Sequence, residues 1–306
     1  MPKTPTTRLH IGISGWRYDP WRGVFYPEGL AQRRELEFAS RHVNTIEING
    51  TFYSLQRPEY FAAWRDDTPN RFEFSVKGPR FITHMKKLKE VDVAVANFFA
   101  SGMLALKEKL GPILWQFPPN MKYDREKFES FLELLPRDTK SAAALAKKHE
   151  PRLKGRALTE TDKNRPLHHA FEIRHESFLV PEFVELLRAH NAALVIADTA
   201  RHFPMPEDVT ADFMYIRLHG DEELYASGYS DVALDRWAAR IKLWKSGKQP
   251  ADANRISIKA PPIENSRDIH VHFDNDVKVH APRDAMKLAE RLGIEWRKQH
   301  AGDSES

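Results

Sequence analysis

The chain has 306 residues, of which 41% are hydrophobic and 29% are charged, a balance typical of a folded globular protein. It contains no cysteine, which excludes disulfide scaffolds, thiolate zinc sites and cysteine nucleophiles. Its net charge of +4 at pH 7 is too small to indicate a nucleic-acid partner by itself. No apolar run reaches the roughly 18 residues that a membrane span needs, and Met1–Arg8 does not resemble a signal peptide. We therefore expect a cytoplasmic location and no membrane partner.

Alternating apolar, branched and aromatic residues predict eight β-strands. They are Leu9–Ser14, Thr45–Asn49, Phe72–Lys77, Ile113–Phe117, Ala170–Arg174, Ala193–Ala197, Met214–His219 and Ile269–Asp274. Helical patterns lie between most of them, with predicted starts at Asp92, Asp124, Pro181 and Ser230. After the sixth strand, Thr199–Asp212 is short and contains two prolines, so we expect at most one helical turn there.

Eight strands that alternate with helices predict an α/β protein with a single (β/α)8 TIM barrel. A doubly wound sheet also fits the alternation. However, Gly12–Gly15 runs into aromatic residues and does not form a glycine-rich dinucleotide loop. We expect one barrel domain over residues 8–297 and a disordered tail over residues 298–306.

A basic insertion is expected at about residues 140–167, before the fifth strand, with a short helix at Ser141–His149. The stretch Arg137–Arg165 holds nine Lys or Arg residues and four Asp or Glu residues. Connections that enter a strand run toward the N-terminal face of a barrel, away from the catalytic end. The insertion is therefore predicted to be peripheral to the strand-end site.

Strand alternation predicts which side chains point into the barrel, because the apolar set must face the helices. The positions left to point inward are Ser14, Glu47, Asn49, Ser75, Lys77, Gln116, Glu172, Arg174, Arg217, His219, His272 and Asp274. Six of these side chains are ionic and must be paired if they are buried. They form either a neutral network that fixes the interior or a functional site. We favour the site, because buried ion pairs are seldom the most stable way to fill a core.

Seven ordered motifs are similar to those of one known family. They are Gly15–Pro27, Glu47–Tyr53, Phe74–Pro79, Leu110–Pro119, Phe171–Ser177, Tyr215–Gly220 and Phe273–Asp276. The series resembles the YecE-like family, the domain-of-unknown-function family 72, from Ile11 to about Leu292. The resemblance implies a TIM-barrel fold and no settled biochemical activity.

Acid–base chemistry is assigned to three inward residues at strand ends. His219 titrates near neutral pH, and Glu172 and Glu47 are the best-placed carboxylates. The predicted substrate-binding residues are Lys77, Arg174, Arg217, Trp16, Tyr18, Asn49, Tyr53, Gln116, Asp274 and Asn275. In this set either Arg174 or Arg217 is expected to contact an anion, because an arginine can pair with a carboxylate and still present donors.

Other histidines have simpler expected roles, a loop cap for His84 and surface exposure for His168, His169 and His202. A divalent metal is possible but not favoured. Three inward cations would compete with a metal ion.

We expect an enzyme, a hydrolase, lyase or isomerase, acting on an anionic small molecule or sugar at the C-terminal face of the barrel. The ligand would carry a phosphate or a carboxylate. An alternative is a nucleic-acid-binding or repair protein that resembles endonuclease IV-type barrels. Lys86-Lys87-x-Lys89 and Arg137–Arg165 would then contact phosphates, and loop aromatics would receive an unstacked base. A non-catalytic scaffold is the third interpretation.

Overall fold

The computed structural model describes residues 8–261 and 267–294. Its strands are β1 (Leu9–Ser14), β2 (Thr45–Ile48), β3 (Glu73–Lys77), β4 (Leu110–Gln116), β5 (His169–Glu172), β6 (Ala193–Leu194), β7 (Ile196–Asp198), β8 (Phe213–Leu218) and β9 (Asp268–Phe273). Its helices are α1 (Glu35–Ala39), α2 (Gly50–Tyr53), α3 (Pro58–Asp66), α4 (Asp92–Ala100), α5 (Arg125–Leu134), α6 (Thr139–Ala146), α7 (Pro181–Ala189), α8 (Asp231–Lys245) and α9 (His280–Arg291). The predicted α/β class with a (β/α)8 TIM-barrel fold is confirmed. The predicted tail at 298–306 lies outside the described residues.

The chain divides into two compact units. Unit 1 comprises residues 1–46 and 179–306, and unit 2 comprises residues 47–178. The expectation of one domain over residues 8–297 stays a prediction.

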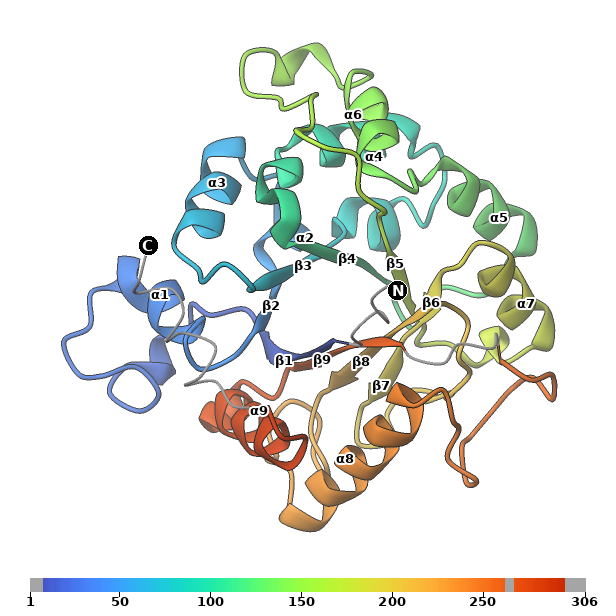
Figure 1. The fold of residues 1–306 in the computed structure, drawn as a ribbon. Helices are drawn as coiled ribbons and strands as arrows, with labels where there is room; N and C mark the ends of the chain where they lie inside the picture. Colours follow the sequence, from blue (N-terminus) through green and yellow to red (C-terminus); the bar gives the residue numbers. More distant parts are fainter. Residues whose placement is uncertain (1–7, 262–266, 295–306) are drawn as a thin grey trace, which may run out of the picture. The chain divides into compact units, whose positions relative to one another are not determined.

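In unit 1, β1 pairs with β9, β9 with β8 and β8 with β7, all in parallel. Helix α9 packs on β1 and β9, and α8 packs beside α9 (Figure 1). The apolar face of α9, with Ala285, Leu288 and Ala289, is fully buried. Burial of this face gives the hydrophobic stabilisation that fixes α9 against the strands.

In unit 2, β3 pairs with β4 and β4 with β5, again in parallel. Helix α3 packs on the helical turns at Met103–Lys109, and α4 packs against α6, where the two helices lie side by side (Figure 1). The short helix predicted at Ser141–His149 in the insertion is present as α6, which spans Thr139–Ala146.

Helix starts follow the side chains that can accept hydrogen bonds from free backbone N–H groups. Asp124 accepts from the Lys127 N–H at the start of α5, and Ser230 accepts from the Ala233 N–H at the start of α8. Both helix starts were predicted from the sequence. Asp138 caps α6 in the same way, through the Ser141 N–H.

The sixth predicted strand differs most from its prediction. It is interrupted at Val195 and forms two short segments, β6 and β7. The Leu194 N–H donates to the Thr210 hydroxyl, so a side chain takes the place of a strand partner. The described segment 199–212 that follows contains turns and no helix, as its length and prolines predict.

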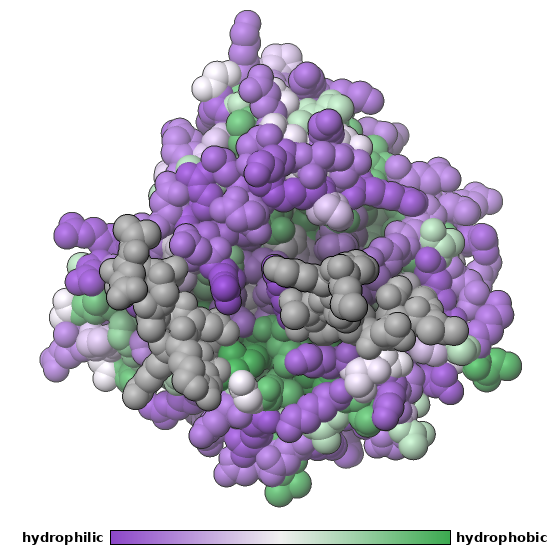
Figure 2. Space-filling view, in the orientation of Figure 1, coloured by the Kyte–Doolittle hydropathy of each residue, from purple (hydrophilic) through white to green (hydrophobic). Residues whose placement is uncertain are grey.

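The surface agrees with this arrangement of helices. Figure 2 shows that hydrophilic side chains predominate over the helices on the face drawn there. None of the helices in residues 8–261 and 267–294 combines the length and the apolar character that a membrane crossing requires.

The Ser230 cap gives a test of helix α8. Ser230→Ala removes the acceptor for the Ala233 N–H and should lower the free energy of unfolding by about 1 kcal/mol. Ser230→Asn keeps a capping acceptor and should cost less. Urea denaturation would measure both. Equal midpoints for Ser230→Ala and the unchanged protein would show that the cap contributes nothing.

Candidate functional site

Most of the side chains predicted to point inward are buried. The buried ones are Ser14, Glu47, Ser75, Lys77, Gln116, Glu172, Arg217, His219 and His272. Their polar and charged groups therefore need partners inside the protein. Several of them gather around Glu172 in unit 2 and around Arg217 in unit 1.

Glu172 is the centre of the cluster in unit 2. Its carboxylate is fully buried, and a single oxygen, Oε1, has three donors within 3.0 Å. Gln116 Nε2 lies at 2.8 Å, and Arg174 Nε and Nη2 both lie at 3.0 Å. Gln116 sits opposite Glu172 in the β4–β5 register, and Arg174 follows two residues later on the same side of the chain. We call these three residues the Glu172 cluster.

Lys77 and His84 lie on either side of the Phe52 ring in the same unit. Lys77 Nζ is 4.6 Å from the centre of that ring, and the His84 ring meets it edge-on at 5.1 Å. The Thr83 hydroxyl is 2.8 Å from His84 Nδ1. Phe52 therefore connects a cation at the end of β3 with an imidazole on the helical turn Phe81–Met85.

The pKa of His84 reports the electrostatics of this region. That pKa is lowered from 6.5 to about 4, mainly by burial and then by the positive charges of Lys77 and Arg174. The negative charge of Glu172 acts in the opposite direction and does not compensate. His84 is therefore neutral at pH 7, and its surroundings favour a bound anion over another cation. From the sequence, His84 was expected to cap a loop.

Four other predicted residues of unit 2 lie in β2, in α2, between these two elements and in β3. Glu47 is fully buried, whereas the Tyr53 side chain is 70% exposed with Arg80 5.9 Å from its ring centre. The buried Asn49 Oδ1 has no hydrogen-bond partner among the described residues, and neither has the Ser75 hydroxyl. Buried polar atoms of this kind are candidates for contact with a ligand or water.

The cluster in unit 1 surrounds Arg217, which is fully buried. Arg217 Nη2 donates to Asp274 Oδ2 at 2.8 Å and to the Ser14 hydroxyl at 3.2 Å, and Nη1 lies 3.3 Å from His219 Nε2. His219 Nδ1 lies 3.1 Å from Asp274 Oδ2. We call these four residues the Arg217 cluster.

This geometry distinguishes the two arginines that were predicted to hold an anion. Arg217 directs its donors at three internal groups and has no exposed surface, whereas the Arg174 side chain is 13% exposed. His219 is fully buried as well, with Tyr225 edge-on to its ring at 5.2 Å. Arg174 is therefore the better placed of the two arginines for a ligand.

The predicted aromatic and amide residues of unit 1 make structural contacts. Trp16 is buried and its carbonyl accepts from the Tyr26 hydroxyl, and the Tyr18 hydroxyl donates to the Ser14 carbonyl at 2.6 Å. Asn275 donates to Asp284 at 2.9 Å, which anchors the loop after β9 to helix α9. These contacts hold the loops that follow β1 and β9.

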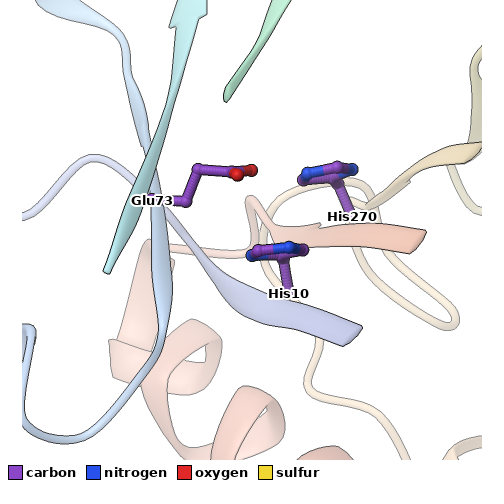
Figure 3. A group of neighbouring side chains, drawn as sticks. All are labelled: His10, Glu73 and His270. Carbon is purple, nitrogen blue, oxygen red and sulfur yellow. The ribbon is translucent and has the colours of Figure 1, made fainter. Parts of the chain in front are cut away.

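Two buried imidazoles of unit 1 were missed. His10 and His270 are opposite in the β1–β9 register, and their rings stack with centres 4.5 Å apart. Figure 3 labels both side chains. Their equivalent positions on paired strands are the sequence signal that could have found them. As metal ligands, these two histidines would supply two donors from unit 1. A catalytic zinc site has three protein ligands.

His169 was expected at the surface and is buried instead. It begins β5, and Trp115 Nε1 donates to its Nδ1 at 3.1 Å, so its Nε2 donates to the Pro136 carbonyl at 2.8 Å. Burial lowers its pKa to about 4 and keeps it neutral. Its role is structural.

Unit 2 also contains a groove with a volume of about 850 Å³. The groove runs past Phe52 and Tyr53, and Glu150, Arg152 and Arg156 of the insertion line it. That the insertion is peripheral to the strand-end site stays a prediction, because this groove is a different surface. The insertion reaches the groove because α6 packs against α4 and Glu150 is hydrogen-bonded to Asn97 of α4.

The fold and the buried strand-end charges define a TIM-barrel protein of the α/β class. The family model described as "Protein of unknown function DUF72" matches residues 10–305, and the chain belongs to this family. The resemblance inferred from the seven motifs is thereby confirmed.

Relatives and solved structures agree with this assignment. The chain is 26% identical to UPF0759 protein YecE of Escherichia coli O157:H7 over 244 residues, which covers 79% of this chain and 84% of that protein. The crystal structure of a DUF72 family protein from Thermotoga maritima superposes with a TM-score of 0.70 at 24% identity, covering 93% and 99% of the two chains. A DUF72 family protein from Enterococcus faecalis gives a TM-score of 0.66 at 16% identity, covering 94% and 96%. These structures establish the likeness of fold.

His84 gives a test of the unit 2 electrostatics. In buffer without phosphate or sulfate, its NMR signals should stay those of a neutral ring down to about pH 4, with His84→Gln used to assign them. The unfolded chain binds this proton near pH 6.5, so the contribution of His84 to stability is complete above that pH and is lost as the pH falls toward 4. His84→Gln should flatten the pH dependence of stability in this window. A His84 midpoint near 6.5 would contradict the assigned environment.

Proposed function

We propose that the protein is an enzyme that binds an anionic small molecule or sugar at the strand ends of unit 2 and transfers protons there. The observation that carries the proposal is the excess of positive charge around a neutral histidine. Burial is the largest cause of the lowered pKa of His84, and the charges of Lys77, Arg174 and Arg80 lower it further against the opposing charge of Glu172. A phosphate or carboxylate group would neutralise this excess.

Arg174 is the residue that we assign to the anion. Its Nε and Nη2 pair with Glu172, which fixes the guanidinium plane and removes the entropic cost of ordering it on binding. Lys77 adds a point charge from the end of the neighbouring β3–β4 pair. Gln116 is assigned to positioning, because its amide holds the Glu172 carboxylate.

Proton transfer at the unit 2 site is assigned to the two carboxylates predicted from the sequence, Glu172 and Glu47, with His84 added. Glu172 and Glu47 are fully buried, which favours the protonated acid unless a cation compensates. An imidazole whose pKa lies below neutral, as at His84, is available as a proton acceptor at pH 7. In unit 1, Asp274 lies within 3.1 Å of His219 Nδ1 and would set the ring orientation of that histidine.

Binding of inorganic phosphate provides the test, measured by calorimetry and by the NMR titration of His84. Phosphate should bind and raise the pKa of His84, because a negative charge stabilises the imidazolium. Arg174→Met should weaken phosphate binding about ten-fold or more, since it removes a charge-assisted contact. Arg71→Met is the matched control, because Arg71 is exposed and precedes β3 at the opposite end of the strand from Lys77.

Glu172→Gln separates the proposed site from a purely structural network. Replacing the carboxylate with an amide removes the charge that opposes Lys77 and Arg174, so phosphate should bind more tightly, at a cost in stability. If phosphate binds equally to the unchanged protein, Arg174→Met and Glu172→Gln, or leaves His84 unaffected, the proposal fails and the cluster is structural.

A further inference from the structure

We propose that the groove of unit 2 is a binding site for single-stranded nucleic acid. The groove shares Phe52 with Lys77 and Arg80 with the surroundings of His84, but the proposal concerns a different ligand, and Glu172, Gln116 and Arg174 do not line the groove. It therefore goes beyond the function proposed above, and either proposal can fail without the other.

The groove is rich in positive charge from separate parts of the chain. Its basic side chains are Arg57, Arg80, Lys86, Arg152 and Arg156, whereas its acidic ones are Glu90 and Glu150. They come from the start of α3, the turn after β3 and the insertion. A single phosphate would need cations that converge on one point. Cations distributed along a groove instead suit a chain that carries a phosphate on every residue.

One acidic and one basic side chain of the groove, Glu150 and Arg152, form an ion pair with each other. The Glu150 carboxylate accepts from Arg152 Nε at 2.7 Å and from Asn97 Nδ2 at 2.7 Å. Asn97 also accepts from the Glu150 N–H at 2.9 Å, so two hydrogen bonds tie the insertion to α4. The insertion is thus held in place as one wall of the groove.

Several large apolar side chains of the groove are exposed to solvent. Such exposure indicates a binding surface, because a folded core would bury these side chains. The exposed fractions are 70% for Tyr53, 63% for Met85 and 44% for Phe81. The Arg80 guanidinium lies 5.9 Å from the centre of the Tyr53 ring. A flat ring beside a guanidinium is a platform on which any unstacked base can lie.

The loop beside the groove carries backbone strain. Lys87, Leu88 and Glu90 have φ values of 46°, 65° and 51°, in the left-handed region that disfavours side chains. Buried Leu88 and the bond from its N–H to the Ile82 carbonyl, 3.1 Å long, hold this conformation. Such strain persists where the surrounding structure fixes it, often at ligand clamps. The strained loop follows the helical turn that carries Phe81 and Met85, and the adjacent Lys86 lines the groove.

Single strands fit these features better than duplexes do. The bases of a duplex are stacked on each other and cannot lie on Tyr53 or Phe81, whereas the bases of a single strand can. Every base has a flat face, so this arrangement predicts binding with little sequence preference.

The test is fluorescence anisotropy with labelled oligothymidine and oligouridine of about 12 nucleotides. Both should bind, and their affinity should fall steeply between about 50 and 200 mM salt. Tyr53→Ala should weaken binding about ten-fold, and Tyr53→Phe should keep it, because the phenylalanine ring still stacks. The double variant Arg57→Gln, Arg156→Gln should reduce the slope of log affinity against log salt by about 1.4, from two lost phosphate contacts. All these side chains are exposed, so the variants should fold.

Arg71→Gln is the matched control, an exposed arginine of the same unit outside the groove. It should change neither the affinity nor the slope by as much as the groove variants do. The proposal is overturned if neither oligonucleotide binds at about 50 mM salt. It is also overturned if Tyr53→Ala binds like the unchanged protein, or if Arg71→Gln lowers the slope as much as one groove arginine does. If a duplex of equal length binds more tightly than the single strand, the ligand is double-stranded and the proposal is wrong. If DNA and RNA differ in affinity, the 2′-hydroxyl contributes and the tighter one is the ligand.

Discussion

A carboxylate that is removed from water must be compensated, and in unit 2 this requirement falls on Glu172, which has no exposed surface. Its compensation comes from Gln116 on the neighbouring strand and from Arg174 two residues along the chain, so strand register decides which partners meet. Because Arg174 is held by Glu172, its charge acts at a fixed place and helps to keep His84 neutral. The electrostatics of the strand ends therefore depend on one buried carboxylate and on the alignment of β4 with β5.

Much of the fold could be predicted from the sequence because its determinants are local. Strand β1 has the predicted bounds, and the capping side chains of Asp124 and Ser230 mark the helix starts that the structure has. The break at Val195 was not predicted, and the Leu194 N–H beside it donates to Thr210, a residue sixteen positions away that no local pattern connects with this strand. His169 was misplaced for a similar reason. Its hydrogen bonds go to Trp115 and Pro136, which are distant in the chain.

The candidate site was predictable to the extent that period-two alternation decides which face a side chain takes. That rule brings Glu172, Gln116 and Lys77 to buried strand ends, and it also identified Arg217 and His219. It is silent on side chains that arrive from outside the strands. His84 comes from a helical turn, so nothing in the alternation indicates that cations surround it. Period-two alternation also does not distinguish an arginine whose donors are all directed at buried groups from an arginine whose side chain is partly exposed. This is the difference between Arg217 and Arg174.

The link between Asn97 and Glu150 has a consequence for how such a protein can diverge. Two hydrogen bonds between residues 53 positions apart attach the insertion to α4, and neither residue belongs to a strand. Changes in the length or composition of residues 147–165 would remodel the outer wall of the groove and leave the β4–β5 register untouched. The strand ends and the outer wall of the groove can then change independently of each other in evolution. A lineage could exchange one of them without rebuilding the other.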